Sequence, residues 1–266
     1  MAATTLFDDE RAGPVTQIFY LSIPVEHQLQ DATSGAGRKW AEALEFIAAS
    51  PGFLRLYWGR QVEESKKVQL HIVRETLEQN EDFLESNLYL DDVLPLIKSI
   101  PDAAAPSAPH HPRHPDLARA SRPTTNHHHH HHRNGVPHLG REFSAGLPIS
   151  TALYGHDDDD RTWVEGEWLL WADAMRRVEG CKTIAGGRLI RRSVAAAPLR
   201  KPDGSGGGGY LIYVGWETLR HDDEYHGTPH FKEQVMVLSA GGKGFKEYGH
   251  VVFQGFKERS NNGVLA

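Results

Sequence analysis

The sequence predicts an α+β protein made of two successive βαββαβ units, and two recurrences carry this prediction. The tripeptide Glu-Thr-Leu stands at 75–77 and again at 217–219, each time after a strand-like run, VQLHIV at 68–73 and YLIYVG at 210–215. Upstream of each copy a second set recurs at constant spacing: Trp40, Gly52 and Gly59 correspond to Trp168, Gly180 and Gly187. Self-similarity in a constant order of elements is the signature of a duplicated unit.

The first unit is expected to span residues 1–145. Residues 15–23 are rich in β-branched and aromatic side chains, which predicts a strand, and residues 38–49 place apolar side chains at helical spacing. Pro51-Gly52 ends that helix. The same patterns predict strands at 53–62, 67–74 and 136–143, and helices at 75–85 and 86–100.

The segment 101–135 interrupts the first unit. It is rich in Pro, Ala, Ser and His, includes six consecutive histidines at 127–132, and offers almost nothing to bury. We therefore expect a disordered insertion. Because a metal site needs fixed geometry and supporting hydrogen bonds, we interpret the His tract as low-complexity or tag-like sequence.

The second unit is expected to span residues 146–266. Its predicted elements are strands at 147–154, 181–190, 210–216 and 245–253, a helix at 161–178, and a helix in two pieces after Trp216. The break is expected at Thr228-Pro229, which has the pattern of a cap followed by the first turn of a new helix.

This order of elements predicts, in each unit, an antiparallel four-stranded sheet with helices on one face, a ferredoxin-like sandwich. The other face of such a sheet is bare and partly apolar, so it needs a cover. The nearest available cover is the second copy in the same chain. The two sheets are therefore expected to pack face to face.

Composition restricts the partners and the compartment. A formal net charge of −6 gives no general attraction to nucleic acid or to anionic lipid. The single cysteine, Cys181, excludes an internal disulfide, and no signal-peptide pattern or membrane-length apolar run is present. We expect a cytoplasmic protein that binds neither nucleic acid nor a membrane.

Three stretches give a family resemblance. They are GFLRLYWGRQVEESKKVQLHIVRETLEQNEDFLES at 52–86, YVGWETLRHDDEYHGTPHFKE at 213–233 and KGFKEYGHVVF at 243–253. They resemble fungal tandem proteins of the antibiotic-biosynthesis-monooxygenase-like, dimeric α+β barrel superfamily. The resemblance implies an intrachain dimeric α+β barrel, with pockets between each sheet and its own helices or inside the barrel.

The activities implied by this resemblance are several. Members include cofactor-free quinone-forming oxygenases, haem-degrading enzymes, polyketide cyclases and proteins without a known activity. Haem-degrading relatives carry a Trp on the second helix and a His ten residues later, where this chain has Tyr225 and Val235. That departure disfavours haem, and we expect no cofactor.

Strand alternation selects the first candidate residues. In the run 68–73, Val68, Leu70 and Ile72 share one face, which is expected to meet the helices. His71 and its counterpart Tyr213 then face the space between the sheets. They are candidate catalytic residues, and the alternative is that they hydrogen-bond each other or a backbone carbonyl and fill space.

The last part of the chain adds His226, Tyr248 and His250 as candidate catalytic residues. One imidazole would act as general base, and Tyr213 or Tyr248 would donate a proton or stabilise an oxyanion. Candidate substrate-binding residues are the aromatic side chains near the strand and helix ends: Tyr57, Trp58, Trp216 and Tyr225. His226 and His230 have a metal-ligand spacing, but the expected helix break separates them, so no metal site is expected.

Two hypotheses of function follow. In the first, the protein is a cofactor-independent monooxygenase or cyclase that acts on a small aromatic or polyketide-like molecule by His-assisted proton abstraction. It requires a pocket that holds an imidazole and a phenol within hydrogen-bond reach. In the second, the protein is a non-catalytic ligand-binding or structural protein with a filled interior. The chain is expected to be a monomeric pseudo-dimer, and the sequence leaves open whether it dimerises again.

Overall fold

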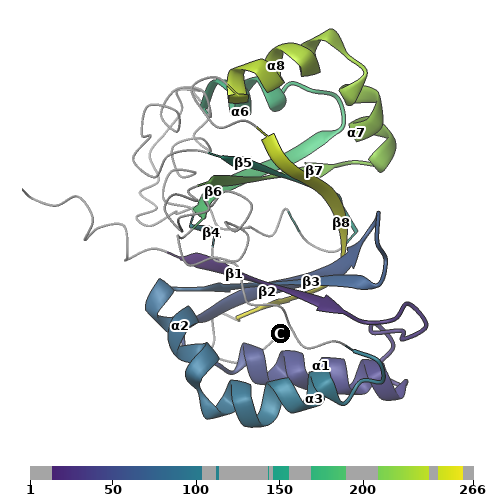
Figure 1. Ribbon diagram of the computed structural model, residues 1–266, viewed down its shortest axis with the longest axis vertical. Helices are drawn as coiled ribbons and strands as arrows, with labels where there is room; N and C mark the ends of the chain where they lie inside the picture. Colours follow the sequence, from purple (N-terminus) through teal and green to yellow (C-terminus); the bar gives the residue numbers. More distant parts are fainter. Residues whose placement is uncertain are drawn as a thin grey trace, which may run out of the picture.

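Two antiparallel sheets close on each other into a barrel, with a layer of helices outside each sheet (Figure 1). The computed structural model describes residues 14–103, 112–113, 143, 146–155, 169–189, 209–239 and 245–259. In Figure 1 the lower layer holds α1, α2 and α3, and the upper layer holds α6, α7 and α8. We call residues 14–103 with their sheet the N-terminal part and residues 146–259 the C-terminal part.

The N-terminal part follows the predicted order closely. Its elements are β1 (Val15–Ser22), α1 (Gly35–Ala48), β2 (Phe53–Gln61), β3 (Lys67–Arg74), α2 (Leu77–Glu85), a π-helical turn η2 (Leu88–Val93) and α3 (Leu94–Lys98). Most of the insertion expected at 101–135 lies outside the described residues, and within it Pro112–Arg113 form a short strand, β4. The strand expected at 136–143 lies outside the described residues except for Phe143, which is buried and not in a strand.

The C-terminal part also follows the predicted order. Its elements are β5 (Pro148–Gly155), α6 (Leu169–Met175), β6 (Cys181–Leu189), β7 (Gly209–Trp216), α7 (Leu219–His226), α8 (Pro229–Ser239) and β8 (Phe245–Glu258). The predicted break at Thr228-Pro229 is present, and the Thr228 hydroxyl accepts a hydrogen bond from the Phe231 amide at 3.1 Å. The first half of the helix expected at 161–178 lies outside the described residues.

Strand β8 joins the two sheets, and this explains why it is longer than expected. The barrel order is β1-β3-β2-β8-β5-β7-β6-β4, and β8 pairs antiparallel with β5 on one side and with β2 on the other. On the far side, β4 bridges β1 and β6. Gly59 permits the close approach of β2 to β8, because a Cβ there would lie 1.9 Å from the carbonyl oxygen of Val252.

The recurrent glycines have the same role in both parts. Gly52 and Gly180 adopt φ of +70° and +79°, a left-handed conformation that favours glycine. Their carbonyl oxygens accept hydrogen bonds from the amides of Glu75 at 2.9 Å and Glu217 at 2.7 Å. Each hydrogen bond holds the end of the strand before the Glu-Thr-Leu tripeptide next to the turn that contains the glycine.

The buried aliphatic face of β3 meets the helices, as strand alternation predicts. Val68, Leu70 and Ile72 belong to one core cluster with Trp40 and Leu44 of α1. The opposite face of β3 lies inside the barrel. The N-terminal helical layer is therefore a packed sheet-on-helix core.

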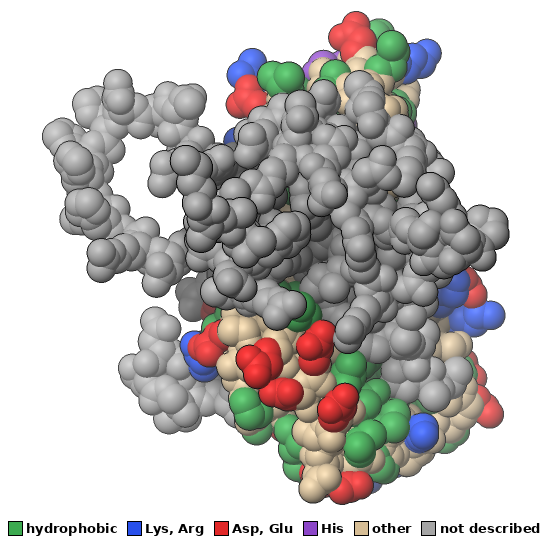
Figure 2. Space-filling view, turned by 60° about the vertical axis from the view of Figure 1, so that its left-hand side comes forward, with side chains coloured by type: hydrophobic (Ala, Val, Ile, Leu, Met, Phe, Trp, Pro, Cys, Tyr) green, Lys and Arg blue, Asp and Glu red, His purple; other side chains and the backbone are tan. Residues whose placement is uncertain are grey.

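Part of the described surface carries acidic side chains. Figure 2 shows Asp and Glu side chains gathering on the lower helical layer, in line with the net charge of −6. In the part of the chain that the structure describes, no helix has the length and apolar character to cross a membrane.

Candidate functional site

The candidate residues fall into three places, and the first is the barrel interior. His71, Tyr213 and Tyr57 are all 0% exposed. The rings of His71 and Tyr213 meet edge-on with centroids 5.7 Å apart, and Nε2 of His71 lies 2.9 Å from Oε1 of Gln69. Tyr57 packs against Phe253. The packing fits the space-filling part of the alternative interpretation, and the Nε2 contact is with a side-chain amide oxygen.

The second place is the N-terminal sheet-on-helix core, which contains Trp58. Its ring meets that of Trp40 edge-on at 5.4 Å, and its side chain is buried on the side of β2 opposite to Tyr57. Neither Tyr57 nor Trp58 lines the cavity described next. An aromatic residue near a strand end has the same pattern in a packed core as in a ligand site, so the sequence does not separate the two.

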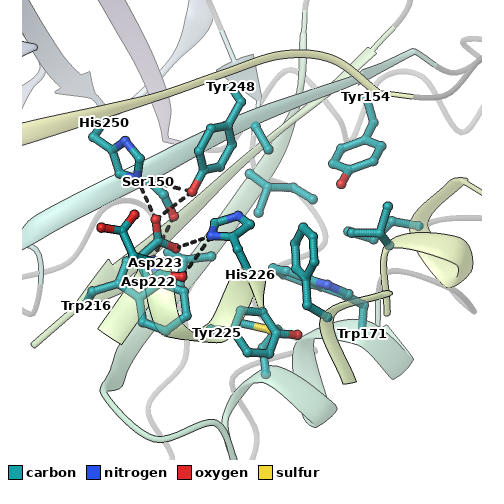
Figure 3. A pocket seen from close by; sticks show the side chains of 17 residues that line it. Ser150, Tyr154, Trp171, Trp216, Asp222, Asp223, Tyr225, His226, Tyr248 and His250 are labelled. Atoms are coloured by element: carbon teal, nitrogen blue, oxygen red, sulfur yellow. Dashed lines mark hydrogen bonds and ion pairs between the residues drawn. The ribbon is translucent and has the colours of Figure 1, made fainter. Parts of the chain in front are cut away.

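The third place is a cavity of about 610 Å³ between the C-terminal sheet and helices α6, α7 and α8 (Figure 3). The other five candidates, His226, Tyr248, His250, Trp216 and Tyr225, all line it. Figure 3 shows the polar side chains at one end and the rings of Tyr154 and Trp171 at the other. The remaining lining is mainly apolar: Ala152, Met175, Ile212, Val214, Phe231, Val235 and Leu238.

Asp222 of α7 organises the polar end of the cavity. It is 1% exposed, and its Oδ2 accepts a hydrogen bond from the Tyr248 hydroxyl at 2.7 Å. Nε2 of His250 lies 2.5 Å from the same oxygen. Burial and then the charge of Asp222 raise the pKa of Tyr248, so this phenol is a hydrogen-bond donor and remains protonated at neutral pH.

His250 lies between two carboxylates. Its Nδ1 contacts Oε1 of Glu63, which comes from the turn between β2 and β3 of the N-terminal part, and its backbone N–H donates to Oε2 of Glu63 at 3.0 Å. Burial lowers the pKa of His250, but the hydrogen bonds and charges of Asp222 and Glu63 prevail and raise it to about 9. The two carboxylates therefore favour the imidazolium form of this residue at neutral pH, which makes it a weaker candidate for the general base.

His226 remains as the candidate base. Its Nδ1 lies 2.8 Å from the backbone carbonyl oxygen of Asp222, and since a carbonyl only accepts, Nδ1 must carry the hydrogen. In the neutral ring Nε2 then carries the lone pair. The ring lies in the cavity between Tyr248 and Phe231, with centroid distances of 5.2 Å and 4.4 Å.

The histidine pair with metal-ligand spacing is separated, as expected. His226 ends α7 and His230 lies in α8, where its Nδ1 is 3.2 Å from the hydroxyl of Tyr225. Among the described residues, no group of three or more His, Cys, Asp or Glu side chains has an arrangement that could hold a metal ion.

Sequence reasoning missed Asp222 and Glu63. A signal for Asp222 exists, because it lies three residues from both Leu219 and Tyr225 and so shares the apolar face of α7. A carboxylate on a buried helix face is unusual unless it is paired. No local signal marks Glu63, because its contact with His250 depends on the pairing of β2 with β8.

Comparisons with known proteins agree on the fold. No protein-family model and no curated protein matches the sequence. A Lactobacillus acidophilus NCFM protein provisionally assigned as a monooxygenase matches with a TM-score of 0.52 and 12% identity, over 96% of this chain and 99% of its own. An anthrone oxidase-like protein matches with a TM-score of 0.56 and 10% identity, over 92% and 93%. A protein provisionally assigned as a chlorite dismutase matches with 0.53 and 10%, over 90% and 94%.

These identities are low, so the likeness shows the fold alone. The chain has the fold of dimeric α+β barrel proteins. Among the described residues, the cavity in the C-terminal part offers room for a small molecule.

Proposed function

We propose that the chain is a tandem of two ferredoxin-like units, and that the C-terminal unit binds a small aromatic or polyketide-like molecule and deprotonates it. One observation carries the proposal: a largely apolar cavity of about 610 Å³ has, at its polar end, an imidazole whose lone pair is available. Cavities of this size enclose drug-sized ligands, and a few placed polar groups orient them. The assignment of two solved relatives of the fold as a monooxygenase and as anthrone oxidase-like supports the same chemistry.

In the proposed step, Nε2 of His226 accepts a proton from a substrate carbon next to a carbonyl group. The electron pair stays on the substrate as an enolate. The hydroxyl of Tyr248 can turn from Asp222 to the enolate oxygen, because the imidazolium of His250 still neutralises the Asp222 carboxylate. These residues supply the deprotonation without a cofactor.

Two fates of the enolate fit this site. In a monooxygenase, dioxygen converts the substrate CH₂ to C=O, so one oxygen atom enters the product and the other leaves as water. In a cyclase, the carbanion attacks a second carbonyl of the same molecule. Oxygen dependence of product formation separates the two reactions.

A thermal-shift titration followed by a turnover assay tests the proposal. Anthrones, hydroquinones and linear polyketide mimics are the probes, and a ligand at a hundred times its Kd stabilises the protein by about 2.7 kcal/mol. For a probe that binds and turns over, His226→Gln should lower turnover by about 10²–10⁴-fold with little change in binding. The control is His27→Gln, because His27 does not line the cavity and its side chain contacts the Pro101 carbonyl oxygen. Full turnover in His226→Gln, or no shift with any probe, would favour the non-catalytic alternative.

A further inference from the structure

We propose that Glu63 is a positioning residue for the C-terminal site: it holds the imidazole of His250 doubly protonated, with Nε2 directed at Asp222. The site would then be completed by a turn of the other part of the molecule. This inference concerns a residue outside the cavity, and its consequence for ligands depends on the proposed function.

The β2–β3 turn is fastened to β8 next to His250. Gln61 pairs with Val251, and the amide of Val62 donates to the carbonyl oxygen of His250 at 3.0 Å. The carboxylate of Glu63 then receives the backbone N–H of His250 at one oxygen and contacts the ring Nδ1 with the other. Two contacts with one residue fix both the position and the rotation of the ring.

The arrangement of acceptors determines the protonation of His250. Nδ1 faces a carboxylate oxygen of Glu63 and Nε2 faces a carboxylate oxygen of Asp222, so both nitrogens must carry hydrogen. In the described structure the Tyr248 hydroxyl also lies 3.2 Å from Nε2, and it donates to Asp222. On the third side, β5 presents Ser150, which is neutral.

The burial of Asp222 at one end of this chain of contacts explains why the carboxylate of Glu63 at the other end matters. The side chain of Asp222 is 1% exposed and that of His250 is 13% exposed, whereas that of Glu63 is 50% exposed. A buried carboxylate needs a counter-charge. His250 supplies it, and among the described residues it is Glu63 that faces Nδ1 on the outer side of the ring.

The alternative is that Glu63 forms an ordinary surface ion pair with no effect on the ring. Exposed pairs of this kind are worth little. The neighbouring Glu64 is such a case: it pairs with Lys67 at 2.5 Å in the same turn and has no contact with His250 in the described structure. Glu64→Gln is therefore a matched control for Glu63→Gln.

The test is NMR titration of the full chain with ¹⁵N-labelled histidine, using His250→Asn to assign the His250 signals. In Glu63→Gln we expect the His250 pKa to fall by about one pH unit or more, whereas Glu64→Gln leaves it unchanged. Glu63→Asp should restore part of the loss, because it keeps the charge at a shorter reach. An unchanged His250 titration in folded Glu63→Gln would overturn the proposal.

A binding measurement separates this inference from the proposed function. If a probe binds the wild type, Glu63→Gln should move the alkaline limit of binding to lower pH, in parallel with the NMR titration. If the titration moves and no probe binds any variant, the positioning role stands and the proposed function fails. If binding shifts in Glu64→Gln as much as in Glu63→Gln, the effect is one of general surface charge and the positioning role is refuted.

Discussion

The two sheet-on-helix layers follow the same order of elements, yet one is packed and the other is hollow. The cavity in the C-terminal layer measures about 610 Å³, whereas the hollow at the matching place in the N-terminal layer measures about 10 Å³. One difference is visible in the strand pairing. Phe19 lies opposite Leu70 in the N-terminal sheet, and Ala152 lies opposite Ile212 in the C-terminal sheet. A phenyl ring fills the space that a methyl group leaves open.

The polar residues at matching positions of the two layers also make different contacts. In the N-terminal layer, the Arg74 guanidinium donates to Gln17 Oε1 at 3.0 Å and to Asn80 Oδ1 at 2.8 Å, and it lies 4.0 Å from the ring centroid of Phe83. Burial lowers the pKa of Arg74 to about 9, which still leaves it charged at neutral pH. These contacts tie the sheet to α2.

At the matching positions the C-terminal layer has Trp216 and Asp222. The indole of Trp216 donates to the Ser150 hydroxyl at 2.8 Å and does not reach across to the helix carboxylate. Asp222 is therefore free to bind Tyr248 and His250 from β8. The same backbone plan supports a tightly packed layer in one part and a candidate site in the other, and a few side chains decide which.

Phe19→Ala should have the largest effect on the difference between the two layers, because it opens a space in the packed N-terminal layer. Removing a 3%-exposed ring from a packed core should lower the free energy of unfolding by about 3–5 kcal/mol. Urea denaturation of both proteins measures the change. Leu90→Ala is the control, since Leu90 is 47% exposed and its loss should cost within about 0.5 kcal/mol. A cost below 1 kcal/mol for Phe19→Ala would mean that this layer is not tightly packed.

Ala152→Phe should make the C-terminal layer resemble the packed N-terminal layer, because the new ring fills the cavity. For any probe that binds the wild type, we expect affinity to fall about a hundredfold, or about 2.7 kcal/mol, because the new ring occupies ligand space. Calorimetric titration measures this loss. Thr151→Ser is the matched control, since the Thr151 hydroxyl donates to the Gly249 carbonyl on the other face of β5. Unchanged affinity in Ala152→Phe would place the ligand elsewhere.

Much of this fold was predictable because its signals are local. The alternation of residues 68–73 gave the correct burial of Val68, Leu70 and Ile72, and Thr228-Pro229 gave the break between α7 and α8. In both cases the deciding interactions lie within one strand or one turn. The length of β8 was not predictable in this way, because its last residues are ordered by pairing with β2.

The candidate site was only partly predictable for the same reason. His226, Tyr248 and His250 are visible as titratable residues in the sequence, but their grouping depends on Asp222 and Glu63, which reach them from a helix face and from the other part of the molecule. His71 could not be told apart from them, since an imidazole in the barrel interior and one in a cavity have the same sequence pattern.

The ion pairs of His250 should also give the two layers opposite pH dependences in alkaline solution. The folded pKa of about 9 lies above the ordinary 6.5, so the stabilisation by His250 is complete below pH 6.5 and disappears as pH rises through 9. The expected loss is about 1–2 kcal/mol, allowing for solvent screening of the Glu63 side. Arg74 acts in the opposite direction, since burial lowers its pKa and protonation is less favourable in the folded state.

The difference between wild type and His250→Asn isolates the C-terminal contribution, because Arg74 is common to both proteins. Denaturation at a series of pH values should show the two curves converging between pH 7 and 10, as the wild type loses the advantage of the imidazolium. Parallel curves over that range would show that His250 is not an imidazolium between its two carboxylates. The hydrogen-bond arrangement at the polar end of the cavity would then need to be assigned differently, with Nε2 of His250 as an acceptor.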